Sequence, residues 1–239
     1  MSRKVSFNEL ATVLMGLSEE EQRALLDYPK ELKKFAGDLS IKIAQEIFFM
    51  PLSDQDVRED LAEITVNWRR LATELDYTGP VVWKVKEGFT LKEHAPLAGP
   101  CYENFQYLQD WNIQDDESTK NSLVFWVPRL VQGSKNKTME ENILVLAELR
   151  QKLELPTHHL TYYGSVSLLS GLILSHFKHT GERTPLNGEW TRTGSLDSDG
   201  HRVVLGDFDA CGLDCDDWPW DGYRNPYIGC FPLGVDLGA

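Results

Sequence analysis

The sequence predicts an α+β fold with a helical N-terminal part, then mixed helices and strands that end in a glycine-rich antiparallel β meander. Apolar residues recur at helical spacing over residues 1–78, and short apolar runs follow. Glycine and Asp-Gly turns crowd the end of the chain. The 239 residues are 41% hydrophobic, which is enough for a buried core. We expect a helical domain or subdomain over 1–78 and an α+β domain over 79–239.

Capping residues and apolar spacing predict the N-terminal helices. Two Ser-x-x-Glu capping boxes open helices within the first 21 residues. A further helical run over 41–48 should end before Pro51. Asp54 is expected to open a longer helix, with an apolar face that continues to Leu75.

The middle of the chain mixes strands and helices. Two short apolar runs, 81–85 and 123–127, predict buried strands. Residues 86–121 are irregular, and we expect loops and short pieces there. Thr138 and Glu141 form another capping box, which predicts a helix to about residue 153.

A central helix is predicted over 165–179. It carries no charged residue before Lys178, so we expect neighbours on at least two sides. Ser167, Gly171 and Ser175 lie on one face at spacings of four, and such small residues let a neighbouring element approach closely.

The β region is predicted over 184–235. Strands over 189–193 and 202–205 flank the segment Asp197-Ser198-Asp199-Gly200. Asp-Gly favours a tight hairpin because glycine adopts positive φ at little cost. The sequence therefore predicts a hairpin at this point of the meander.

Charge and apolar runs exclude several classes of protein. A net charge of -13 argues against binding to nucleic acid or to an anionic membrane surface. The start of the chain lacks a signal-peptide pattern, and the longest apolar stretch is too short to span a membrane. We therefore expect a cytoplasmic protein with free thiols on its four cysteines.

Asp-x-Asp pairs are the first candidate site. On an extended strand, residues two apart point to the same face, so each pair places two carboxylates side by side. Hard cations such as Ca²⁺ and Mg²⁺ prefer these ligands, although the spacing does not fit an EF-hand. A solvated acidic surface is the alternative. The candidate metal ligands are Asp197, Asp199, Asp207 and Asp209.

An acidic, aromatic segment is the second candidate site. Residues 181–239 hold 11 acids and 4 arginines but no lysine. Aromatic rings beside acids are typical of binding surfaces, although they are equally typical of a compact β core. The candidate partner-binding residues are Asp214, Asp216, Asp217, Trp218, Trp220, Asp221 and Tyr223.

The histidines give weaker signals. His158 and His159 are adjacent, and we expect their side chains to point apart, so that at most one could join a site. His176 lies on the apolar face of the central helix and is expected to be a core residue. Phosphate-binding loops, nucleophile elbows and zinc-protease motifs are absent from the sequence.

These observations favour a cytosolic protein that docks a basic protein partner through its acidic C-terminal face, as an inhibitor or immunity protein does. The alternative is a hydrolase of a phosphate ester that depends on a divalent cation, with His201 as acid or base. A third interpretation is a homodimer joined through the aromatic residues. The missing catalytic motifs favour binding over catalysis.

Overall fold

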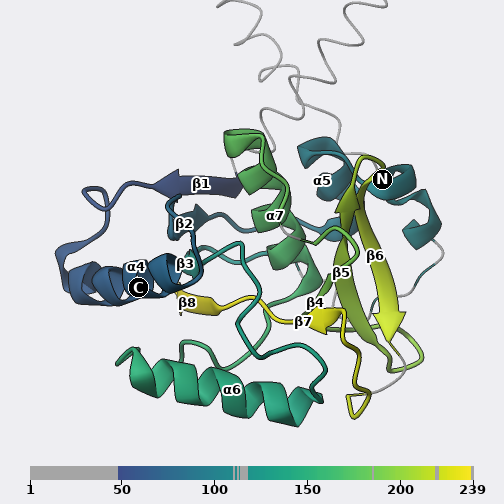
Figure 1. Cartoon of the computed structure of the whole chain (residues 1–239). Helices are drawn as coiled ribbons and strands as arrows, with labels where there is room; N and C mark the ends of the chain where they lie inside the picture. The colour runs from purple at the N-terminus through teal and green to yellow at the C-terminus, as the bar shows by residue number, and fades with distance from the viewer. Residues whose placement is uncertain are drawn as a thin grey trace, which may run out of the picture.

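In the computed structural model, two four-stranded sheets flank one central helix, α7 (Val166–Thr180) (Figure 1). The structure describes residues 48–109, 111, 113, 118–184, 186–218 and 221–237. The mixed α+β class is confirmed. The helices predicted before residue 48 lie outside the described residues, and the division at residue 78 stays a prediction.

The first sheet is antiparallel throughout. Its strand order is β1 (Phe49–Leu52), β2 (Val82–Val85), β3 (Ser122–Trp126) and β8 (Leu233–Leu237). Side chains alternate between its two faces, as the pleat requires. One face packs toward α7 with Trp83, Val85, Val124 and Trp126. The other face packs toward α4 (Ala62–Glu74) and α6 (Met139–Lys152) with Val82 and Phe125.

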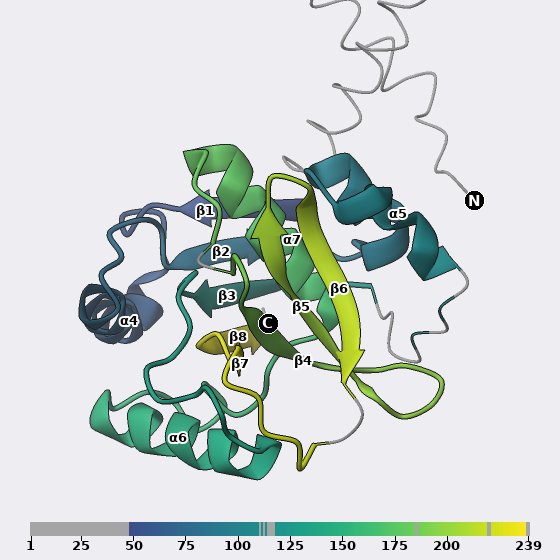
Figure 2. The same ribbon diagram turned by 45° about the vertical axis from the view of Figure 1, so that its right-hand side comes forward.

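The second sheet contains the predicted hairpin. Its strand order is β6 (Gly212–Trp218), β5 (Arg202–Asp209), β4 (Trp190–Leu196) and β7 (Ile228–Gly229) (Figure 2). Strands β4, β5 and β6 form the antiparallel meander, whereas β7 pairs with β4 in parallel. The meander does not continue to the end of the chain, because β8 pairs with β3 in the first sheet.

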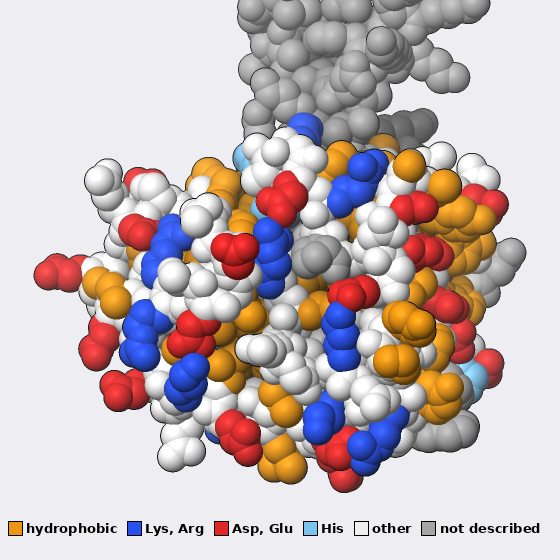
Figure 3. Space-filling model, viewed as in Figure 1, with side chains coloured by type: hydrophobic (Ala, Val, Ile, Leu, Met, Phe, Trp, Pro, Cys, Tyr) orange, Lys and Arg blue, Asp and Glu red, His pale blue; other side chains and the backbone are white. Residues whose placement is uncertain are grey.

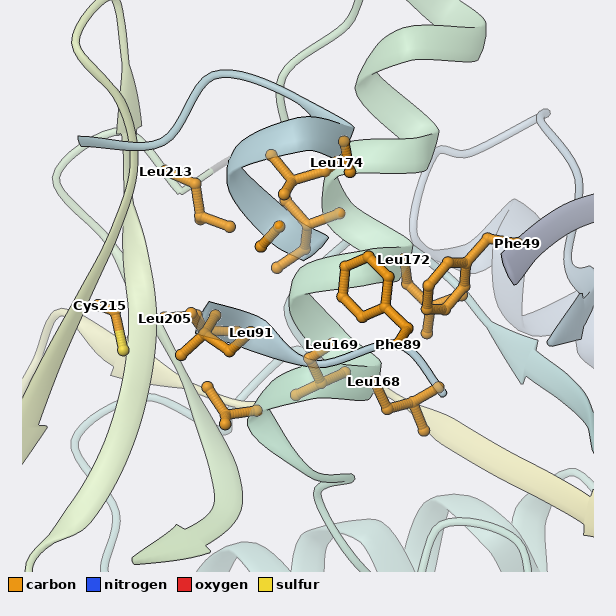
Figure 4. Packing of buried hydrophobic residues seen from close by; sticks show 14 of the residues in the cluster. Phe49, Phe89, Leu91, Leu168, Leu169, Leu172, Leu174, Leu205, Leu213 and Cys215 are labelled. Atoms are coloured by element: carbon orange, nitrogen blue, oxygen red, sulfur yellow. The ribbon is translucent and has the colours of Figure 1, made fainter. Parts of the chain in front are cut away.

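Helix α7 packs as its sequence predicts. The Ser165 side chain accepts a hydrogen bond from the Leu168 N–H at 3.2 Å, and Gly181 ends the helix at φ 71°. A Cβ atom at Gly171 would lie 2.0 Å from the Phe49 ring, so the small residue admits β1. Figure 4 shows Phe49 and Phe89 against this part of α7. His176 is fully buried, as expected.

Residues 49–52 form a strand that the sequence analysis did not predict, and Pro51 is tolerated there because β1 is an edge strand. The predicted start of a helix at Asp54 needs correction. Asp54 lies in a turn, and its carboxylate pairs with Arg69 at 2.7 Å. Helix α4 begins at Ala62, after the 3-10 turn η1 (Glu59–Leu61).

Residues 86–121 hold more structure than loops. They include the helix α5 (Leu91–Ala98) and the 3-10 segment η2 (Tyr102–Gln109), which lies beside β6. Strand β3 begins directly after them. All four cysteines are free, as expected. Within the described part of the chain, no helix is both long and apolar enough to cross a membrane.

Candidate functional site

Asp197 organises the turn between β4 and β5. Its carboxylate is 2% exposed, and one oxygen, Oδ1, accepts the backbone N–H groups of Asp199 at 2.9 Å and of His201 at 2.8 Å. The Asp197 N–H also donates to the carbonyl of His201. Aspartate commonly stabilises turns in this way. The predicted hairpin is therefore confirmed, with a buried carboxylate at its centre.

His201 joins this carboxylate to a second one on β6. The β5–β6 register pairs Val203 with Asp217, which brings Asp217 beside His201. His201 Nδ1 lies 2.6 Å from Asp217 Oδ2 and 3.4 Å from Asp197 Oδ2. We call these three residues the His201 cluster. The hydrogen bond to Asp217, together with the charge of Asp197, holds the pKa of His201 above its ordinary value.

The four aspartates predicted as metal ligands do not meet at one place. Asp197 and Asp199 precede β5, whereas Asp207 and Asp209 lie at its far end, roughly 20 Å away at the usual rise of a strand. At that end, Asp207 accepts the Gly188 N–H and Asp209 accepts the Cys211 N–H. Binding of Ca²⁺ or Mg²⁺ by this region stays a prediction, but these carboxylates do not form a single four-residue site.

Two of the predicted partner-binding acids also protect the edge of the second sheet. Strand β6 is an edge strand, and the Asp214 carboxylate accepts the outward N–H of Cys215 at 2.8 Å. Asp216 accepts the next outward N–H, that of Asp217, at 2.9 Å. The Tyr107 hydroxyl donates to Asp214 at 2.6 Å. Because these backbone N–H groups of β6 are already hydrogen-bonded, pairing with a strand of another protein is disfavoured. A partner would therefore contact the side chains of β6.

The β6 acids lack cationic partners of fixed charge. Among the described residues, no Lys or Arg forms an ion pair with Asp214, Asp216 or Asp217. Partial burial, together with the carboxylates of Asp217 and Asp214, raises the pKa of Asp216. Figure 3 shows acidic side chains interspersed with hydrophobic ones along the side of the molecule where β6 lies.

An aromatic pair adjoins these acids. The Trp218 and Tyr223 rings meet edge to face, with centroids 5.5 Å apart. The Asp221 carboxylate forms a two-pronged ion pair with Arg202, at 3.0 and 2.9 Å. Trp218 and Tyr223 are therefore neighbours, and Asp221 is paired with Arg202, while a partner-binding role for these residues stays a prediction. Trp220 lies outside the described residues.

A buried arginine, which the sequence analysis missed, anchors this loop. Arg192 is 1% exposed, and its Nη2 donates to the carbonyls of Lys137 at 2.8 Å and Tyr223 at 3.1 Å. Burial lowers the pKa of Arg192. A single arginine in a strand carries no signal of such a role, because the residues that it contacts are distant in sequence.

A second cluster contains His158, His159 and Asp236. His158 Nε2 lies 2.7 Å from Asp236 Oδ1, and His159 Nε2 lies 3.4 Å from Asp236 Oδ2. The expectation that these histidines point apart is therefore wrong. Side chains of adjacent residues point in opposite directions on an extended strand, whereas His158 and His159 lie in a turn. We call this group the His159 cluster.

A tryptophan fixes the protonation of His159. Trp68 Nε1 lies 3.1 Å from His159 Nδ1, and an indole N–H only donates. His159 Nδ1 must therefore be unprotonated, so that Nε2 of the neutral ring carries the proton toward Asp236. Burial lowers the pKa of His159 to about 4. His159 is thus a hydrogen-bonded core residue with no lone pair directed at Asp236.

The described part of the chain is an α+β fold in which two sheets flank one helix, and strand β6 carries three acids at the edge of the second sheet. Comparison with protein-family models, curated proteins and solved structures finds no match to it.

Proposed function

We propose that the protein binds a basic protein partner through an acidic face at the edge of the second sheet. The acidic face consists of Asp214, Asp216, Asp217, Trp218, Asp221 and Tyr223. The observation that carries the proposal is that its three β6 acids pair with no Lys or Arg among the described residues. The neighbouring carboxylates repel one another, and a basic partner surface would relieve that repulsion. Such a partner would also associate with the acidic face faster at low salt.

The aromatic pair supports the same proposal. Tyr223 is 38% exposed, and Trp218 is half-buried beside it. Amphipathic rings next to charge are frequent anchors at protein interfaces, where arginine stacks on them. Arg192 links the Tyr223 carbonyl to the Lys137 carbonyl, so part of this surface is ordered before binding.

Charge reversal tests the proposal. Asp216→Lys changes an exposed acid that has no ion partner among the described residues, and Tyr223→Ala removes the exposed ring. The matched control is the pair Glu59→Lys and Glu63→Lys, two exposed acids in η1 and in the first turn of α4, away from β6 (Figure 1). Each protein is used as bait for crosslinking capture from a lysate, at low and at high salt.

We expect wild type and the control to capture the same strongly basic proteins, and the double variant to lose at least nine-tenths of that signal. High salt should weaken wild-type capture, because at about 1 M salt exposed charges are screened beyond about 3 Å. Equal capture by the acidic-face variant, or a captured set without basic proteins, would refute the proposal.

A further inference from the structure

We infer that the His201 cluster binds one divalent transition-metal ion through Asp197 Oδ2, His201 Nδ1 and Asp217 Oδ2. Zn²⁺ and Mn²⁺ represent the class. The inference goes beyond the docking proposal. It shares Asp217 with the acidic face, but it rests on the geometry of the turn before β5, where Asp197 and His201 lie.

The distances suit a metal ion. The three ligand atoms all lie within 4.8 Å of one another. Bonds of about 2.0–2.2 Å place tetrahedral ligands about 3.3–3.6 Å apart. Asp197 Oδ2 and His201 Nδ1 already lie 3.4 Å apart. The 2.6 Å contact between His201 and Asp217 is shorter because it holds a proton, and a metal ion would replace that proton.

Asp197 is prepared for this role by its surroundings. Its Oδ1 accepts two backbone N–H groups, which fixes the buried carboxylate and leaves Oδ2 directed at His201. His201 immediately precedes β5, and Asp217 belongs to β6, so paired strands set their separation. Ligands held by hydrogen bonds and rigid elements bind a metal without first being ordered.

The ligand set selects the class of ion. One imidazole nitrogen and two carboxylate oxygens suit Zn²⁺ and Mn²⁺, whereas Ca²⁺ takes six to eight oxygens and Mg²⁺ prefers oxygen ligands with several waters. The His201 side chain is 34% exposed, so solvent reaches the cluster from one side. Three protein ligands with an open side leave a coordination position for water.

The His159 cluster supplies the internal contrast. It also offers two nitrogen atoms and a carboxylate within 4.8 Å. However, the Trp68 hydrogen bond keeps the proton on His159 Nε2, and a protonated ring nitrogen cannot ligate a metal. Of these two clusters in the described part of the chain, the His201 cluster is therefore the metal site.

Titration of the full chain tests the inference. Protein stripped with EDTA is titrated calorimetrically with Zn²⁺, Mn²⁺, Mg²⁺ and Ca²⁺, and Co²⁺ is followed by its visible absorption. The variants are His201→Gln and Asp217→Asn, and His158→Gln is the matched control because it removes an exposed imidazole that also bonds a carboxylate. Melts without metal establish that each variant folds.

We expect one Zn²⁺ or Mn²⁺ per chain and a Co²⁺ spectrum. Each cluster variant should weaken binding at least tenfold, whereas His158→Gln should leave it unchanged. Absence of binding, binding unaffected by either cluster variant, or loss of binding in the control would overturn the inference. Asp216→Lys with Tyr223→Ala should retain the metal, so failure of the docking proposal remains distinguishable from failure of this one.

Discussion

The two His–carboxylate clusters contain similar residues in opposite surroundings. In the His201 cluster, one imidazole nitrogen faces two carboxylates, and its side chain is 34% exposed. In the His159 cluster, two imidazoles share the single carboxylate of Asp236, and His159 is fully buried. The pKa is raised for His201 and lowered for His159. Similar ligands therefore do not imply the same chemistry.

The two clusters differ in the hydrogen bonds that surround each imidazole and its carboxylate. The Trp68 indole N–H donates to His159 Nδ1, so the neutral ring carries its proton on Nε2, which lies 3.4 Å from Asp236 Oδ2. In the His201 cluster, backbone N–H groups bond the Asp197 carboxylate instead, and the proposed metal ion would replace the proton that His201 Nδ1 shares with Asp217. The contacts around the two imidazoles thus separate a structural group from a proposed binding site.

The largest expected effect concerns acid and the buried histidine. The pKa of His159 is about 4 in the fold against an ordinary 6.5, with His158 and Asp236 as its titratable neighbours. Between these pH values the unfolded chain binds a proton that the folded chain does not. The free energy of unfolding should therefore fall as pH falls from 6.5 to 4, by about 3 kcal/mol from this group.

Urea unfolding of wild type and His159→Asn across pH 4–8 measures this effect. Asparagine keeps an acceptor for Trp68 but does not titrate in this range. The stability advantage of wild type should be constant above pH 6.5 and shrink below it. His176, whose pKa is also lowered to about 4 by burial, contributes equally to both proteins. A difference that does not vary with pH would contradict the assignment.

The sequence predicts the local part of each cluster. The segment Asp-Ser-Asp-Gly predicts the hairpin turn, and the capping residues predict the starts of α6 and α7. The remaining partners depend on strand pairing over long separations. Asp217 reaches His201 through the β5–β6 register, and Asp236 reaches His159 only because β8 joins the first sheet. Periodicity does not specify which strands become neighbours.

The acids of β6 are a second case in which the sequence does not show which strands become neighbours. Asp214 and Asp216 lie two residues apart on a strand and share a face, as the pattern predicts. Their bonds to the outward backbone N–H groups follow from the position of β6 at the edge, which the sequence does not reveal. The strand at 49–52 was missed for a related reason, because a proline is tolerated in a strand only at an edge position such as that of β1.

A smaller effect is expected from removal of the indole donor. Trp68→Phe deletes the hydrogen bond to His159 Nδ1 and leaves a buried acceptor without a partner, so stability should fall by about 2–3 kcal/mol. Trp83→Phe is the matched control, since Trp83 is equally buried but its Nε1 has no partner among the described residues. Urea unfolding should show the larger loss for Trp68.

Nitrogen NMR of the imidazoles adds a second measurement to this comparison. In wild type the His159 signals should report a proton fixed on Nε2, and in Trp68→Phe they should report a mixture of tautomers. Equal stability losses at Trp68 and Trp83, with an unchanged tautomer, would show that the indole does not control His159.

Two glycines give the smallest and most direct contrast between the clusters. A Cβ atom at Gly234 would lie 2.6 Å from Cγ of His159, whose ring is fully buried and cannot move aside. Gly234→Ala should therefore cost about 2 kcal/mol through overpacking. Gly200, in the His201 turn, has open space around it but a φ of 81°. Gly200→Ala should cost about 1 kcal/mol through backbone strain alone.

Thermal melts of the two variants distinguish these causes. A companion His159→Ala change makes room for the Cβ at Gly234, so the penalty of Gly234→Ala should shrink in that background. The penalty at Gly200 should be the same in both backgrounds, because the strain lies in its own φ angle. If His159→Ala leaves the Gly234 penalty unchanged, the buried ring does not pack rigidly against β8, and the contrast between the rigid and open clusters loses its structural basis.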